Sequence, residues 1–257
     1  MTSLEERIRS LDTSLFSAIP SQMSENDKKA LLLLQNCVKN RGEYIYLEIG
    51  SHLGGTIQPF YADSACKLIY SIDKRPEFQP DERRRMSHYP DNSTERMLSN
   101  LSNAFPSILD KKIRTFDCDA SDLDPSKIIE KPDLCFIDAE HTNEAVFSDF
   151  KFCIKICHPN AIIAFHDAWV IFKGIEKIKK FLSKNSIPFR GFILLGNVYA
   201  ILFNESISAY TEKLKPLSVD EIKYFKRSRN YLRKIYIKSK YPLFYQFLRI
   251  GKRALKT

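Results

Sequence analysis

Acidic and histidine side chains end several apolar segments of this chain, and they are residue types that can bind a cation or move a proton. Asp138 follows one apolar run, with His141 three residues later, and His166 and Asp167 follow the next run. Carboxylate oxygens are the ligands that Mg²⁺ prefers, and an imidazole titrates near neutral pH. The four residues are therefore candidates for metal binding and for general acid–base chemistry.

Short apolar segments that alternate with helical patterns are expected to position these residues. The predicted strands are 44–49, 66–72, 113–116, 133–137 and 161–165, followed by a hairpin of 189–195 and 198–203 around Gly196-Asn197. This order predicts an α/β fold, a doubly wound, mostly parallel sheet with a C-terminal antiparallel hairpin. Ligands of such sheets bind beyond the carboxyl ends of the strands, where the acidic side chains lie.

Helices and loops are expected between the strands. Residues 1–40 read as two helices, the second capped by Ser24 with Asp27 at its third position. Further helices are predicted at 56–66, 91–104, near Pro125, at 143–157 and at 171–182, and the charged, proline-marked segment 74–90 is predicted to be a loop. The expected organisation is N-terminal helices at 1–40, a ligand-binding domain at 41–209 and a helical extension at 210–257.

The first strand runs into a glycine loop typical of a nucleotide-type site. Gly50, Gly54 and Gly55 allow a sharp turn and close approach of a ligand to the main chain, with Ser51 and Thr56 in the same loop. The spacing is Gly-x-x-x-Gly, which differs from the dinucleotide and P-loop patterns. Asp73, at the end of the next strand, can accept hydrogen bonds from ribose hydroxyls, and Asp119 from an adenine amino group.

These residues resemble the class I S-adenosylmethionine-dependent methyltransferases, in which an acid, one residue and Gly-x-x-x-Gly follow the first strand. Glu48, Gly50 and Gly54 match that pattern, Asp73 matches the ribose-binding acid, and Asp119 with Ala120 matches the adenine-side loop. The resemblance covers about residues 40–205. It implies a seven-stranded Rossmann-like sheet, S-adenosylmethionine as cofactor, and roles in cofactor binding for these residues and for Ser51 and Thr56.

The stretch from Phe136 to Glu144 is similar to the Ile-Asp-Gly-Asp-His-x-x-Glu stretch of small-molecule and sugar O-methyltransferases, including macrolide-sugar enzymes that use a divalent metal. The similarity implies Asp138 and Asp167 as metal ligands, with His166 where an acid would complete the pair, and His141 as base. Mg²⁺ suits the carboxylates, whereas a histidine ligand favours Mn²⁺, Fe²⁺ or Zn²⁺.

Structural roles are the alternative for each of these side chains. Asp138 can cap the following helix, and His141 or the pair of His166 and Asp167 can serve packing or hydrogen bonding alone. Trp169, the only tryptophan, is expected to pack beside the site rather than to stack on a substrate.

The net charge of +9 is concentrated at one end of the chain. Residues 210–257 hold 14 basic and 3 acidic residues, whereas the first 209 hold 26 and 28, so a nucleic-acid-binding function of the whole protein is not expected. A capping box at Ser218 and Glu221 predicts a helix to about Lys240, and a second basic, aromatic stretch follows at 243–255. Segment 218–256 either contacts an anionic membrane or docks its apolar face on the sheet.

The sequence favours an S-adenosylmethionine-dependent O-methyltransferase that acts on a sugar hydroxyl of a glycan, glycolipid or glycosylated metabolite, assisted by a divalent metal. Six cysteines without a C-x-x-C motif and a charged N-terminus without an apolar stretch favour a cytoplasmic enzyme, located in solution or at the inner face of a membrane. The alternatives are a hydroxylase-like enzyme of the same fold and a non-catalytic membrane-associated binding protein.

Overall fold

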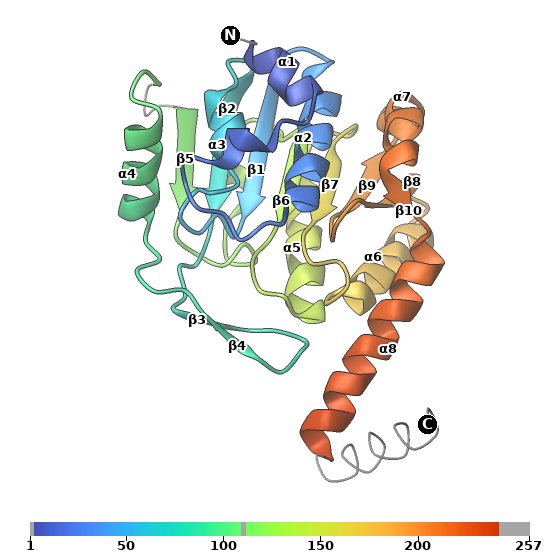
Figure 1. Cartoon of the computed structure of the whole chain (residues 1–257). Helices are drawn as coiled ribbons and strands as arrows, with labels where there is room; N and C mark the ends of the chain where they lie inside the picture. Colours follow the sequence, from blue (N-terminus) through green and yellow to red (C-terminus); the bar gives the residue numbers. More distant parts are fainter. Residues whose placement is uncertain (1–2, 109–111, 242–257) are drawn as a thin grey trace, which may run out of the picture.

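The computed structural model describes residues 3–108 and 112–241 (Figure 1). An eight-stranded sheet forms the centre of the molecule, in the order β10-β8-β9-β7-β6-β1-β2-β5. The strands are β1 (Tyr44–Ile49), β2 (Cys66–Ile72), β5 (Ile113–Phe116), β6 (Leu134–Ile137), β7 (Ile162–Phe165), β8 (Phe189–Leu194), β9 (Tyr199–Phe203) and β10 (Ser218–Val219). The pairs among β5, β2, β1, β6 and β7 are parallel, and β9, β8 and β10 add antiparallel strands.

Helices cover both faces of the sheet, as the near-continuous apolar strands predict. The helices are α1 (Leu4–Arg9), α2 (Glu25–Lys39), α3 (Gln58–Ala62), α4 (Thr94–Ala104), α5 (Asn143–Ile156), α6 (Phe172–Lys184), α7 (Glu205–Leu214) and α8 (Glu221–Lys240). Side chains alternate across β1, so that Tyr46 packs in the core beneath α2 and Leu47 in the core beneath α5. Each side of the sheet therefore has its own apolar core.

The predicted fold class is confirmed, and the hairpin around Gly196 lies where the sequence indicated. Ser24 caps α2 with Asp27 in a capping box, as predicted. The predicted boundary after residue 209 falls within α7. Among the described residues, no helix is long and apolar enough to cross a bilayer.

Several local predictions were wrong. Segment 74–90 contains a two-stranded hairpin, β3 (Phe78–Pro80) with β4 (Met86–His88), rather than a loop alone. The segment at Pro125 forms only a short 3₁₀ helix, η3 (Pro125–Lys127). Ser218 pairs with β8 as part of β10, an eighth strand beyond the seven expected, and Asp220 is the residue that caps α8. The predicted stretch 243–255 lies outside the described residues.

Two segments reach beyond the carboxyl ends of the parallel strands. Figure 1 shows the β3–β4 hairpin below the sheet, with α8 extending down beside it. The hairpin is fixed to the loop after β6, because the main-chain N–H of Glu82 donates to the carbonyl oxygen of His141 at 3.2 Å and the side chain of Glu82 accepts from the N–H of Asn143 at 3.0 Å. The hairpin therefore covers the edge of the sheet where ligands of this architecture bind.

Candidate active site

A cavity of about 330 Å³ lies at the carboxyl ends of β1, β2, β6 and β7, within the size range of small-molecule sites. Four structural parts surround it: the glycine loop, the segment before α2, the β3–β4 hairpin and the ends of β6 and β7. The lining residues include Gly50, Ser51, His52, Gly55, Thr56, Asp73, Gln79, Arg83, Ser87, Tyr89, Asp138, His141, His166, Asp167, Asn197, Asp27 and the segment 20–24. The structure thus brings most of the residues singled out from the sequence to one cavity.

Close main-chain contacts explain two of the glycines. Gly50 has a φ of +91°, and a Cβ there would lie 2.4 Å from the carbonyl oxygen of Asp138 at the end of the neighbouring strand. A Cβ on Gly55 would lie 2.3 Å from the carbonyl oxygen of Pro20. Both positions therefore need glycine so that the loop fits between β6 and the segment before α2.

Glu48 lies beneath the glycine loop and does not line the cavity. Its carboxyl group accepts hydrogen bonds from the hydroxyls of Thr56 and Tyr46, the latter at 2.6 Å. Complete burial raises the pKa of Glu48 to about 8, although both hydroxyl bonds act in the opposite direction. In this arrangement Glu48 links the end of β1 to the loop from below.

Asp73 lies at the end of β2 and is engaged by the chain itself. Its carboxylate accepts from the main-chain N–H groups of His52 at 2.9 Å and Arg75 at 2.8 Å. The guanidinium of Arg75 donates to the carbonyl oxygen of His52 at 2.5 Å and lies 3.3 Å from the hydroxyl of Ser51. Arg75 therefore connects the glycine loop to β2, a role that the sequence analysis missed.

The two residues predicted for the adenine side lie apart from the cavity lining. Asp119 accepts hydrogen bonds from the N–H and hydroxyl of Ser121 at 3.1 and 2.9 Å, and its carboxylate lies 3.5 Å from the ammonium of Lys74. Ala120 is buried in the core beneath α5. Gly54 also does not line the cavity and has a φ of +85°.

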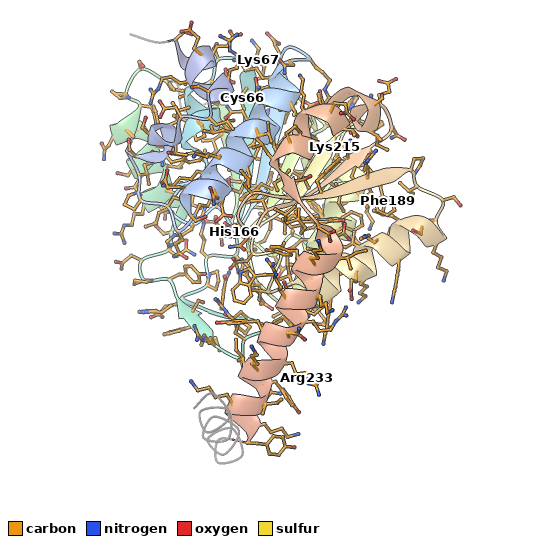
Figure 2. All side chains as sticks on the ribbon, turned by 45° about the vertical axis from the view of Figure 1, so that its right-hand side comes forward. Cys66, Lys67, His166, Phe189, Lys215 and Arg233 are labelled. Carbon is orange, nitrogen blue, oxygen red and sulfur yellow. The ribbon has the colours of Figure 1, made fainter. Side chains whose placement is uncertain are left out.

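Three acidic side chains and two imidazoles form a continuous row at the other end of the cavity. The Nδ1 atom of His166 lies 2.8 Å from Oδ1 of Asp138, and its Nε2 atom lies 3.6 Å from Oδ2 of Asp27. The Nε2 atom of His141 lies 3.3 Å from Oδ1 of Asp138 and 3.7 Å from Oδ2 of Asp167. His166 lies near the centre of the molecule in Figure 2.

Charge pairing dominates the electrostatics of this row. Burial alone would raise the pKa of Asp138, but the charge of His166, its hydrogen bond to Asp138 and the nearby imidazole of His141 outweigh it and lower that pKa. Burial would lower the pKa of His166, but the negative charge of Asp138, the hydrogen bond to Asp138 and the nearby carboxylate of Asp27 raise it well above its usual value. A charged imidazole held between two carboxylates is therefore expected near neutral pH.

The row includes a candidate metal cluster. Ligand atoms of Asp138, His141 and His166 all lie within 4.8 Å of one another. The Nε2 atom of His141 is buried and makes no hydrogen bond to any described residue, although two carboxylates flank it. An orphaned nitrogen between carboxylates fits a site that a cation or a substrate hydroxyl completes.

Asp27 is the second residue whose role the sequence analysis missed. Its carboxylate accepts from the hydroxyl of Ser24 at 2.5 Å as part of the helix cap, and from the N–H of Asn197 at 2.6 Å in the β8–β9 turn. It is 2% exposed. The capping signal was visible in the sequence, but the contact with Asn197 spans 170 residues and arises only on folding.

Two alternative roles from the sequence analysis can be compared with the geometry. Thr142, not Asp138, caps α5 by accepting from the N–H of Ala145 at 3.2 Å. The indole N–H of Trp169 donates to Oδ1 of Asp167 at 3.2 Å, and its ring packs edge-on against Tyr231 of α8 at 5.3 Å between centroids. Trp169 thus packs beside the site, between Asp167 and α8.

Comparison with known proteins gives one family and a set of similar folds. The profile of a family described as a methyltransferase domain matches residues 47–168. A search among curated proteins found no match. The structure of the O-methyltransferase NovP is similar at 13% identity and a TM-score of 0.53, covering 69% of this chain and 79% of that one.

Two further solved structures have similar folds. The calicheamicin methyltransferase CalS11, named in its apo structure as a TDP-rhamnose 3'-O-methyltransferase, is 14% identical with a TM-score of 0.52, covering 80% of this chain and 96% of that one. The MycE methyltransferase from the mycinamycin biosynthetic pathway, in complex with Mg and SAH, is 12% identical with a TM-score of 0.50, covering 77% and 55%.

Because the sequence identities are low, these similarities concern the fold alone. The family match begins inside β1 and ends just after β7. It therefore includes the carboxyl ends of all four strands that form the cavity. On this basis residues 47–168 are similar to a methyltransferase domain.

Proposed function

We propose that the protein is an O-methyltransferase that methylates a sugar hydroxyl of a glycan, glycolipid or glycosylated metabolite. The observation that carries the proposal is the buried Nε2 atom of His141, which has no hydrogen-bond partner among the described residues and lines the same cavity as the glycine loop. A nitrogen so placed can accept the proton of a hydroxyl bound in the cavity. The sugar-modifying enzyme among the structures of similar fold supports a sugar as acceptor.

His141 is the proposed general base. In the methyl transfer, the acceptor oxygen forms a bond to the methyl carbon, the bond from that carbon to sulfur breaks, and the hydroxyl proton moves to Nε2 of His141. Asp138 and Asp167, at 3.3 and 3.7 Å from this nitrogen, stabilise the imidazolium that results. The hairpin contact from Glu82 to the carbonyl oxygen of His141 fixes the main chain of the base.

The donor is proposed to bind at the opposite end of the cavity, against Gly50, Ser51, Thr56 and Asp73. The close approach that Gly50 and Gly55 permit favours contact between the donor and the main chain of the loop. Glu48 and Gly54 do not line the cavity and would contribute by fixing the conformation of that loop. Asp119 and Ala120, which also lie outside the cavity lining, would border the adenine.

A divalent metal fits the residues at the reacting end. Asp138 and Asp167 are the proposed ligands, because carboxylate oxygens suit Mg²⁺, the metal present in the MycE structure. When bound, the metal would lower the pKa of the acceptor hydroxyl and orient it. His166 would need to be neutral to bind a metal, whereas its pairing with Asp138 and Asp27 favours the charged form. We therefore assign to His166 the orientation of Asp138 rather than a place among the ligands.

Calorimetric titration with S-adenosylhomocysteine tests donor binding, and no heat of binding at millimolar ligand would reject it.

Incubation with S-adenosylmethionine and a panel of sugars, TDP-rhamnose included, then tests the acceptor class by mass spectrometry. A product heavier than the acceptor by the mass of one methylene group is expected. A product heavier by the mass of one oxygen atom would identify a hydroxylase instead.

Metal dependence has its own experiment. Treatment with EDTA and the substitution Asp138→Asn are each expected to abolish most of the activity, with recovery on addition of Mg²⁺ after EDTA alone. Activity unchanged by both treatments would remove the metal from the proposal while leaving the donor site and His141 in place.

A further inference from the structure

The β3–β4 hairpin has two distinct faces. Side chains alternate along its strands, so that Gln79 and Ser87 line the cavity while Phe78 and Met86 point to the opposite side. Phe78 is 52% exposed and Met86 63% exposed. Because Gln79 and Ser87 face the cavity, the exposed side chains of Phe78 and Met86 face away from it.

Helix α8 uses its apolar face on its own domain. Phe225 is buried against Phe172 and Tyr199, with ring centroids 6.0 and 6.1 Å apart, and the hydroxyl of Tyr224 donates to Asn197 at 3.0 Å. The helix therefore does not offer this face to a bilayer. The sequence left open whether this segment contacts a membrane or docks its apolar face on the sheet. The first turns of α8 dock on the domain.

The farther half of α8 carries basic side chains that lack acidic partners. Its ion pairs join Glu221 to Lys179 and Arg229 to Glu176, both in the first half of the helix. Within residues 3–108 and 112–241, no acidic side chain lies within 4.0 Å of the charged groups of Arg233, Lys234 or Lys238. All three are exposed, and Arg233 is visible in Figure 2 on the part of α8 that extends beyond the domain.

The hairpin and α8 are joined at the edge of the cavity. The guanidinium of Arg84, in the hairpin turn, stacks on the ring of Tyr236 at 4.5 Å. Arg83 stacks on Trp169 at 5.5 Å, and Trp169 contacts Tyr231. The two elements therefore lie side by side. Their exposed side chains are here called the basal surface, which comprises Phe78, Arg84, Arg85 and Met86 of the hairpin and Arg233, Lys234 and Lys238 of α8.

We propose that the basal surface binds anionic lipid headgroups and so holds the cavity at the surface of a membrane. Exposed cations without acidic partners are attracted to an anionic leaflet, and the exposed Phe78 and Met86 side chains can enter its interface. A nucleic acid would satisfy the charges but would leave these apolar side chains in water, so the combination favours a lipid surface. This inference goes beyond the proposed function and does not depend on it.

Vesicle co-sedimentation of the full chain tests the proposal. Binding to mixed phosphatidylcholine and phosphatidylglycerol vesicles is expected, with much weaker binding to phosphatidylcholine alone. Each basic residue near an anionic surface contributes about fivefold in affinity, so the triple variant Arg233→Gln, Lys234→Gln, Lys238→Gln is expected to weaken binding at least ~10-fold. The double variant Phe78→Ser, Met86→Ser is also expected to bind more weakly.

A matched triple variant provides the control. Lys223, Lys226 and Arg227 are exposed on the same helix but near the sheet, and changing them to glutamine removes the same charge. This control is expected to change vesicle affinity less than ~3-fold. An unchanged far-ultraviolet circular dichroism spectrum and an unchanged urea midpoint of each variant would show that its fold is retained.

Four results would overturn the proposal: equal binding of the wild type to neutral vesicles, wild-type affinity of the basal triple variant, equal losses in the two triple variants, or tighter binding of a DNA duplex than of anionic vesicles. Equal losses would indicate an effect of net charge rather than of the basal surface.

Discussion

The glycine-loop end of the cavity, around Gly50 and Asp73, differs from the histidine end, around Asp138 and His141, in what fixes its geometry. At the glycine-loop end, main-chain groups make close contacts, as between Gly50 and the carbonyl of Asp138 or between the N–H of His52 and Asp73. At the histidine end, ionisable side chains from three distant segments hold one another. The first arrangement depends on shape and the second on charge, so the two ends should respond differently to substitution.

Removal of the proposed base should separate the two ends most clearly. His141→Gln is expected to lower kcat by about 10²–10⁴-fold, because the hydroxyl proton loses its acceptor, while affinity for S-adenosylhomocysteine stays unchanged. Steady-state kinetics and calorimetry measure the two quantities. His158→Gln, a histidine between α5 and β7, is the control and should leave both at wild-type levels. Equal losses of donor affinity and kcat in His141→Gln would contradict the separation.

Glu48 makes stability depend on pH beneath the glycine-loop end. Because burial raises its folded-state pKa to about 8 from 4.5, the folded state holds a proton that the unfolded chain releases. Stability from this group is therefore fully present below about pH 4.5 and is lost as the pH rises to about 8.

Urea unfolding at several pH values measures this effect. Glu48→Gln cannot ionise, so the variant is expected to lose less stability than the wild type between pH 5 and pH 9, by roughly 2–4 kcal/mol. A wild type and variant with parallel pH profiles would show that Glu48 is charged in the folded state.

Asp27 tests whether the histidine end relies on the N-terminal helix. Asp27→Asn is expected to lower the free energy of unfolding by about 1–3 kcal/mol, since charged contacts with Asn197, Ser24 and His166 are weakened together. Ser24→Ala removes the helix cap alone and should cost about 1 kcal/mol. Urea denaturation compares the two, and equal losses would indicate that Asp27 serves only as a cap residue.

Substitution of Arg75 is expected to have the smallest effect, and that effect should be confined to the glycine-loop end. Arg75→Lys keeps the charge but loses the planar group that reaches His52, Ser51 and Asp73. Affinity for S-adenosylhomocysteine is expected to fall by about 5–10-fold, with kcat at saturating donor within ~2-fold of the wild type. A fall confined to kcat would place Arg75 with the histidine end.

Local patterns in the sequence predicted most of the sheet and the acids at its strand ends. Strands such as β1 and β6 are short apolar runs that end in polar residues, and that pattern depends on neighbours in the chain alone. The β3–β4 hairpin was missed because its strands have three residues each and prolines nearby. The start of α8 was misplaced because Ser218 and Asp220 are both good N-caps, and pairing of Ser218 with Leu194 decided between them.

The sequence by itself determined that the acidic ends of parallel strands would lie near a glycine loop. The apolar runs, the acids that end them and the glycine turn are all local patterns in the chain. Only the tertiary structure decided what each side chain meets there. It placed Glu48 beneath the loop, brought Asp27 from the N-terminal helix to His166, and left Nε2 of His141 facing two carboxylates. Such contacts join residues far apart in the chain, and their distances and burial set the charge states on which the proposed chemistry depends.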